Sequence, residues 1–148
     1  MNAFRSYVWD PGLIIAQIVC MQAIFYTAFC VVTAIASVRG LHPSLQQIFA
    51  SQVTLQGATV QLLSAAFCAF ALSRVVGRSK QCLDFSCTVH FWHAIFVTLY
   101  RESFITQIYW WLLQLSSIAV CTVLGEYLCL RIESREIPVS AGGSRYEV

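Results

Sequence analysis

The chain alternates between long uncharged apolar runs and short islands of charge. The first run, residues 13–38, contains no charged residue. An apolar helix of about 18 residues or more is long enough to cross a hydrocarbon layer about 30 Å thick. The pattern predicts an all-α fold, in which one membrane domain spanning the whole chain forms a bundle of four transmembrane helices. The predicted spans cover residues 13–36, 55–76, 85–101 and 107–129.

Composition supports a lipid-exposed protein. Hydrophobic residues make up 58% of the 148 residues and charged residues 11%, and a soluble domain of this size cannot cover so much apolar surface with so few charges. The lipid bilayer is therefore an expected partner. The first run is longer than the signal-peptide core of about 7 to 15 residues, and acidic Asp10 precedes it, so we expect it to be retained as a signal anchor.

Basic residues predict the orientation of the spans. With four spans the two termini and the middle loop lie on one side of the membrane, and the two outer loops lie on the other. The first set contains seven basic residues and the second contains two, so the positive-inside rule places both termini in the cytosol. Residues 139–148 are predicted to form a disordered cytosolic tail. The seven are Arg5, Arg74, Arg78, Lys80, Arg131, Arg135 and Arg145, and the two are Arg39 and Arg101.

Two ridges of small or polar residues predict the faces that point into the bundle. Small residues recur every four positions in the second span, a spacing that lets another helix approach closely. A second set in the fourth span shares one helical face. The first ridge consists of Ala65, Ala69 and Ser73, and the second of Gln114, Ser117, Cys121 and Gly125.

A short amphipathic segment follows the first span. The turn signal His42-Pro43-Ser44 precedes residues 45–49, which mix apolar side chains with two glutamines. This composition predicts a segment that lies along the membrane surface.

Few residues inside the apolar runs can carry chemistry. Glu126 is either an interfacial carboxylate near Arg131 or a proton-relay group. His90 and His93 face the same way on a helix, and we interpret them as neutral side chains hydrogen-bonded to neighbouring helices or to a hydroxyl. Adding Cys82 and Cys87 gives a possible metal set, but its order lacks the CxxC pair of a structural zinc site. No metal or other cofactor is expected.

Several functional classes are excluded by what the chain lacks. It has no catalytic triad motif and no glycine-rich phosphate loop, so we do not expect an enzyme. Seven acidic against nine basic residues leave no nucleic-acid surface. The seven cysteines contain no CxxC motif, which excludes a thiol oxidoreductase. Cys82, Cys87 and Cys129 lie near the predicted cytosolic face, where reversible palmitoylation occurs.

Three separated groups of residues resemble one known family. FRSYVWDP occupies residues 4–11, KQCLDF and TVHFWH occupy residues 80–85 and 88–93, and GEYLCLR with EIP occupies residues 125–131 and 136–138. These motifs, in this order, are similar to those of the Sys family of small Golgi membrane proteins. The resemblance covers residues 4–138, nearly the whole chain.

The resemblance implies a four-span protein of the trans-Golgi membrane that acts in protein trafficking. In this family the protein is a docking receptor that targets an ARF-related small GTPase to the membrane. We expect the partner-binding residues among the motif and loop residues of the cytosolic side. They are Arg5, Trp9, Asp10, Arg78, Lys80, Asp84, Glu126 and Arg131.

One alternative function follows from the residues alone. A small proton-coupled transporter or channel would use Glu126 and His93 as its titrating groups. Neither the oligomeric state nor the contact residues for a GTPase follow from the sequence.

Overall fold

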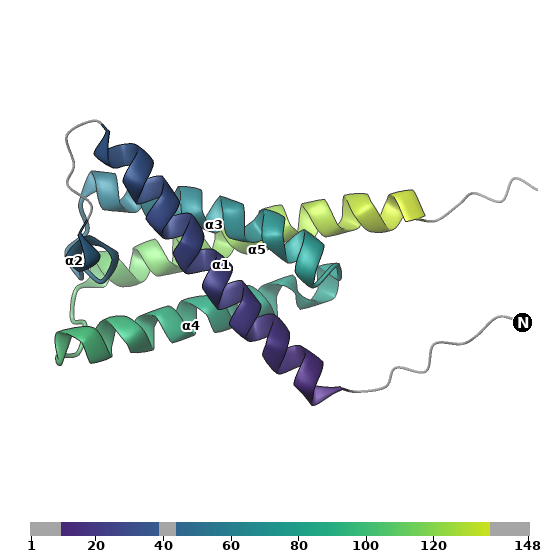
Figure 1. Ribbon diagram of the computed structural model, residues 1–148, viewed down its shortest axis with the longest axis horizontal. Coiled ribbons are helices and arrows are strands. Elements are labelled where there is room, and N and C mark those ends of the chain that lie inside the picture. The colour runs from purple at the N-terminus through teal and green to yellow at the C-terminus, as the bar shows by residue number, and fades with distance from the viewer. Residues whose placement is uncertain (1–9, 39–43, 137–148) are drawn as a thin grey trace, which may run out of the picture.

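The computed structural model describes residues 10–38 and 44–136, and within these ranges it is almost entirely helical (Figure 1). Arg5, Trp9, Arg39, His42 and the predicted tail 139–148 lie outside the described residues. The elements in chain order are α1 (Pro11–Ser37), α2 (Leu45–Ile48), α3 (Leu55–Val75), a 3-10 helix η1 (Ser79–Gln81), α4 (Cys82–Arg101) and α5 (Ile108–Glu136).

Local capping fixes where two of the long helices begin. The Asp10 carboxylate accepts hydrogen bonds from the amides of Gly12 and Leu13, at 3.0 and 3.4 Å, and Pro11 occupies the first helical position, where its missing N–H is harmless. The Thr54 hydroxyl accepts from the Gly57 amide at 3.1 Å and caps α3 in the same way.

Within the described residues, four helices are long and apolar enough to cross a membrane, as predicted. α3, α4 and α5 run lengthwise, and α1 crosses them obliquely (Figure 1). α3 packs most extensively against α5 and α1. The described chain starts and finishes at one end of the bundle, together with the turn between α3 and α4. We call this the terminal end, and the end that carries α2 and the α4–α5 turn the loop end.

The core lies where the predicted inward ridges meet the large side chains of α1. Met21 and Phe25 of α1 and Leu72 of α3 are fully buried. Both predicted ridges are confirmed, because every member is buried: Ala65, Ala69 and Ser73 on α3, and Gln114, Ser117, Cys121 and Gly125 on α5.

Two apolar side chains of the segment around α2 pack against the bundle, and the position of this segment along the membrane surface stays a prediction. Ile48 is only 8% exposed and belongs to the main core cluster. The Phe49 ring stacks on Tyr100 with the ring centroids 4.9 Å apart. Ile48 and Phe49 contact protein at the loop end of the bundle, where burial removes an apolar side chain from water just as lipid contact would.

Candidate functional site at the terminal end

The turn between α3 and α4 is built around a glycine. Gly77 has φ +63°, a left-handed conformation that glycine adopts without a Cβ clash. Its amide and that of Val76 both donate to the Leu72 carbonyl, at 3.2 and 2.9 Å, and so close the end of α3. The chain then enters η1, which leaves Arg78 and Lys80 exposed at the terminal end.

Three long-range hydrogen bonds attach neighbouring elements to this turn. The Glu133 carboxylate on α5 accepts from the Ser79 amide at 3.3 Å and from the Ser79 hydroxyl at 3.2 Å. The Gln17 side-chain amide on α1 donates to the Val75 carbonyl at 3.2 Å. Hydrogen bonds to a charged group are stronger than neutral ones. The turn is therefore held in place relative to both α1 and α5.

Close packing joins α4 and α5 directly beneath the turn. The buried sulfurs of Cys82 and Cys129 lie 3.6 Å apart, and both thiols are free. A Cβ added at Gly125 would lie 3.5 Å from a Leu72 methyl carbon and 3.6 Å from the Cys82 sulfur. Of the three cysteines singled out for palmitoylation, only Cys87 has an exposed side chain.

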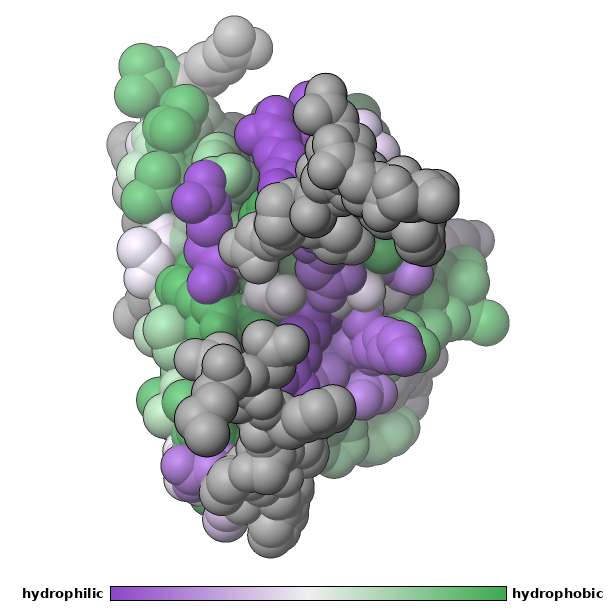
Figure 2. All heavy atoms as spheres, turned by 90° about the vertical axis from the view of Figure 1, so that its right-hand side faces the viewer, coloured by the Kyte–Doolittle hydropathy of each residue, from purple (hydrophilic) through white to green (hydrophobic). Residues whose placement is uncertain are grey.

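Exposed charges of both signs gather at the terminal end. Figure 2, which views this end, shows hydrophilic side chains between hydrophobic flanks. Arg74 lies above the Phe70 ring at 5.4 Å from its centroid, a cation–π arrangement. The structure brings six of the eight predicted partner-binding residues to this end with exposed side chains: Asp10, Arg78, Lys80, Asp84, Glu126 and Arg131.

The two histidines are buried in the middle of the bundle. The Tyr26 hydroxyl of α1 and His93 Nδ1 lie 3.1 Å apart, as predicted for a histidine bonded to a neighbouring helix. His90 Nδ1 lies 2.9 Å from the Ser86 carbonyl oxygen of its own helix, which differs from that prediction. His93 is 11 residues beyond Cys82 on α4, about 16 Å at the helical rise. Gly125 packs against Cys82, and Glu126 is the next residue on α5, so Glu126 lies near the level of Cys82 along the bundle. His93 and Glu126 therefore do not share a site.

The residues that organise this end were not singled out by the sequence patterns. Ser79, Glu133 and Gln17 are polar residues at or near the ends of apolar runs, where a solvated side chain is the ordinary expectation. The one usable signal was Gly77 next to Arg78, which marks a turn. Nothing local indicates that Glu133 reaches back across 54 residues to Ser79.

Comparison with known proteins places the chain among Golgi-linked membrane proteins. A family model described as "SYS1: Integral membrane protein S linking to the trans Golgi network" matches residues 4–139. Protein SYS1 homolog of Nematostella vectensis is 40% identical over 95% of this chain and 94% of its own. Protein SYS1 homolog of Dictyostelium discoideum is 35% identical over 94% of this chain and 63% of its own. Protein SYS1 of Saccharomyces cerevisiae is 29% identical over 84% of this chain and 65% of its own. No solved structure matches the chain.

Proposed function

This chain belongs to the SYS1 family of integral membrane proteins that link to the trans-Golgi network, and on that premise we propose that it is a docking receptor for an ARF-related small GTPase on trans-Golgi membranes. The GTPase is the partner that the motif resemblance implies. Receptor function needs no catalytic group, because docking requires only a surface that the partner recognises.

The observation that carries this proposal is the meeting of separated motifs at the terminal end. The start of α1, the start of α4 and the last turns of α5 come from distant parts of the sequence, yet they lie at one end of the bundle (Figure 1). Their charged residues are exposed there. Polar and charged surfaces of this kind direct a partner by electrostatic complementarity.

The held turn makes this surface suitable for docking. Glu133 and Gln17 fix the α3–α4 turn through hydrogen bonds, so Arg78 and Lys80 are presented from an ordered backbone. A preorganised surface loses less conformational entropy on binding. An amphipathic segment of the GTPase can insert into the headgroup layer beside the bundle and add apolar contact area.

Removing the charged side chains at the α3–α4 turn should release the GTPase from Golgi membranes. We expect the triple variant Arg78→Ala, Lys80→Ala, Asp84→Ala to leave this protein in Golgi membranes while the GTPase becomes cytosolic. The share of each protein that remains with Golgi membranes is measured by cell fractionation and by fluorescence microscopy. Arg101→Ala, at the loop end, is the matched control and should leave the GTPase in place.

The outcome that would reject this surface is retention of the GTPase by the triple variant at the control level. Co-purification from detergent-solubilised membranes, with the GTPase fixed in its GTP- or GDP-bound state, tests the receptor function separately. A receptor of this kind should capture one nucleotide state in preference to the other.

A further inference from the structure

Two residues whose polar atoms are buried without partners lie along a groove on the outer surface of the bundle. The groove lies between α4 and α5, has a volume of about 550 Å³ and is lined mostly by apolar side chains. Gln114 and His90 line it too, although they are only 4% and 2% exposed. Within the described part of the chain, both atoms of the Gln114 amide and the His90 Nε2 have no hydrogen-bond partner. Such atoms are costly to bury unpaired.

The depth of these atoms limits what can pair with them. His90 is the ninth of the 20 residues of α4, close to its middle. The Trp110 ring stacks against His93 at 6.3 Å, and Gln114 lies one turn further along α5, toward the terminal end. Lipid tails offer no hydrogen-bonding group at this depth, and lipid headgroups lie at the two surfaces. A polar side chain from another transmembrane helix is the group that fits.

The outer face of α1 is an unusual surface to expose to lipid. Its residues are small and recur with alternating spacings of four and three, as in the seam of a left-handed coiled coil. This face lies opposite the buried side chains Met21, Phe25 and Phe29. Small residues are enriched where transmembrane helices pack closely together. The exposed small-residue face consists of Ala16, Cys20, Ala23, Thr27, Cys30 and Ala34.

We propose that the outer face of α1 from a second copy of this chain packs into the α4–α5 groove, with its Thr27 hydroxyl beside Gln114 and His90. The Thr27 hydroxyl donates to the Ala23 carbonyl of its own helix at 2.8 Å, and its free lone pair can accept from the Gln114 side-chain amide. The contact joins two different surfaces, so each copy both gives a helix and receives one. The small face allows the close approach that a concave groove requires.

Membrane depth fixes the register of this contact. Within one chain the Phe25 ring lies 5.4 Å from the His90 ring, and the Tyr26 ring lies 5.8 Å from the His93 ring. Thr27 is therefore at the level of these histidines. Two copies in one membrane with the same orientation keep the same depths, so Thr27 of one copy reaches the level of Gln114 in the other.

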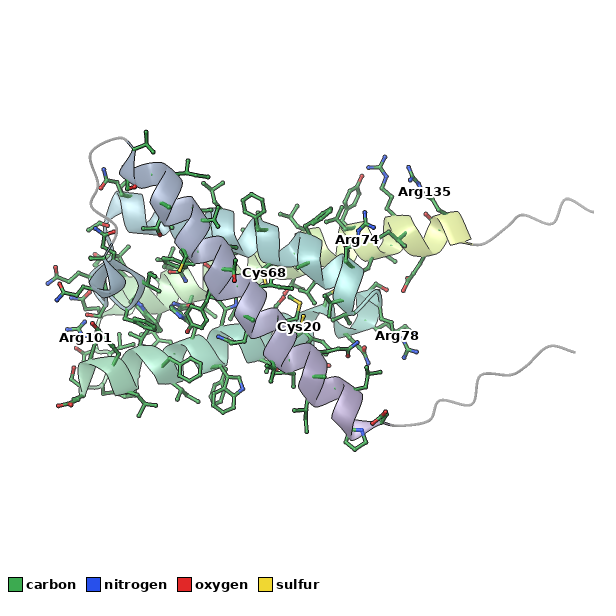
Figure 3. The ribbon with its side chains drawn as sticks, viewed as in Figure 1. Cys20, Cys68, Arg74, Arg78, Arg101 and Arg135 are labelled. Carbon is green, nitrogen blue, oxygen red and sulfur yellow. The ribbon has the colours of Figure 1, made fainter. Side chains whose placement is uncertain are left out.

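The same register aligns two native cysteines. Cys20 is seven residues before Thr27 on α1 (labelled in Figure 3), and Cys87 is six residues before His93 on α4. At a rise of about 1.5 Å per residue, Cys20 lies about 10 Å closer to the terminal end than Thr27, and Cys87 about 10 Å closer than His93. Both are exposed, and Cys87 lines the groove. Cys20 of one copy should therefore lie near Cys87 of another.

Cross-linking in native membranes tests the contact with the full-length protein. Two differently tagged copies are expressed together and treated with a short bis-maleimide, and mass spectrometry identifies the joined peptides. The expected product joins Cys20 to Cys87 between copies. Cys20→Ser and Cys87→Ser should each abolish it. Cys30→Ser is the matched control, because Cys30 lies on the same face but about 15 Å deeper, and it should leave the product unchanged.

Three further variants separate helix packing from thiol chemistry. Ala23→Phe places a large ring on the small face and should lower the cross-linked yield at least fivefold. Ile15→Phe changes an exposed position about 100° away around α1 and should not alter the yield. Gln114→Leu removes the unpaired amide without exposing new polar groups, and it should also lower the yield.

Three outcomes would overturn the proposal. One is the absence of the Cys20–Cys87 product although a small maleimide still modifies both thiols. A second is Cys87 joined to a different membrane protein, which would assign the groove to another helix. The third is an equal yield of Cys30–Cys87 product, which would mean random collision in the membrane.

Discussion

At the scale of single residues, Gly125 lets α5 pack closely against two other helices. Its spacing from Gln114, Ser117 and Cys121 places it on the inward face, and the structure confirms this. The atoms that it meets, on Leu72 and Cys82, belong to two other helices. Their positions depend on how each helix is rotated in the bundle, and a pattern along one helix does not contain that rotation.

Two substitutions at Gly125 should show how large a side chain the contact with the neighbouring helices can accept. Gly125→Ala adds a Cβ at ordinary contact distances of 3.5 to 3.7 Å, and alanine is the better helix former by about 0.8 to 1.0 kcal/mol. We expect the unfolding temperature of the purified protein in detergent to stay the same or rise. Gly125→Leu overpacks the site and should cost about 1 to 3 kcal/mol. Equal destabilisation by both variants would contradict this view of the contact.

At the scale of elements, the sequence predicted membrane spans but not where the helices end. The fourth span was predicted to end at residue 129, between Glu126 and Arg131, and α5 continues beyond that point to Glu136. Charges end the lipid-embedded part of a helix without ending its backbone hydrogen bonds. Arg135 in the last turn also interacts favourably with the helix dipole. The extra turns are the ones that place Glu133 against Ser79.

Removing this carboxylate should loosen the α3–α4 turn. Glu133→Ala deletes the acceptor of two hydrogen bonds, and hydrogen bonds to charged groups contribute about 1.5 to 3 kcal/mol each. We expect faster amide hydrogen exchange in residues 76–81, measured by mass spectrometry in detergent or nanodiscs. Ser134→Ala changes the next residue, whose hydroxyl bonds only within α5, and exchange in the turn should then match the unmodified protein. An unaltered turn in Glu133→Ala would mean that backbone bonds alone hold it.

At the scale of the whole molecule, the order of apolar and charged segments was enough to predict four helices. Helix ends cluster at two levels because each short connection reverses the chain. Most of the described basic residues lie at the terminal end: Arg74, Arg78, Lys80, Arg131 and Arg135, against Arg101 at the loop end. The side of the membrane that each end faces stays a prediction from this asymmetry.

Cysteine accessibility can measure that orientation. Lys80→Cys at the terminal end and Gln52→Cys at the loop end both introduce exposed thiols. In sealed Golgi vesicles with the cytosolic side outward, a charged maleimide should label Lys80→Cys at once. It should label Gln52→Cys only after the membrane is permeabilised. The unmodified protein measures the background from its native cysteines, and the reverse labelling order would invert the predicted topology.

The lengths of α3 and α4 also bear on where in the cell the protein is stable. Their 21 and 20 residues correspond to about 31 and 30 Å, and each carries an arginine in its last turn. Hydrocarbon layers grow from about 27 Å in the endoplasmic reticulum to about 32 to 33 Å in the plasma membrane. In the thicker membrane these two helices are about 1 to 3 Å short, a mismatch that costs only fractions of a kcal/mol per Å. Their lengths therefore fit a bilayer thickness between these two limits.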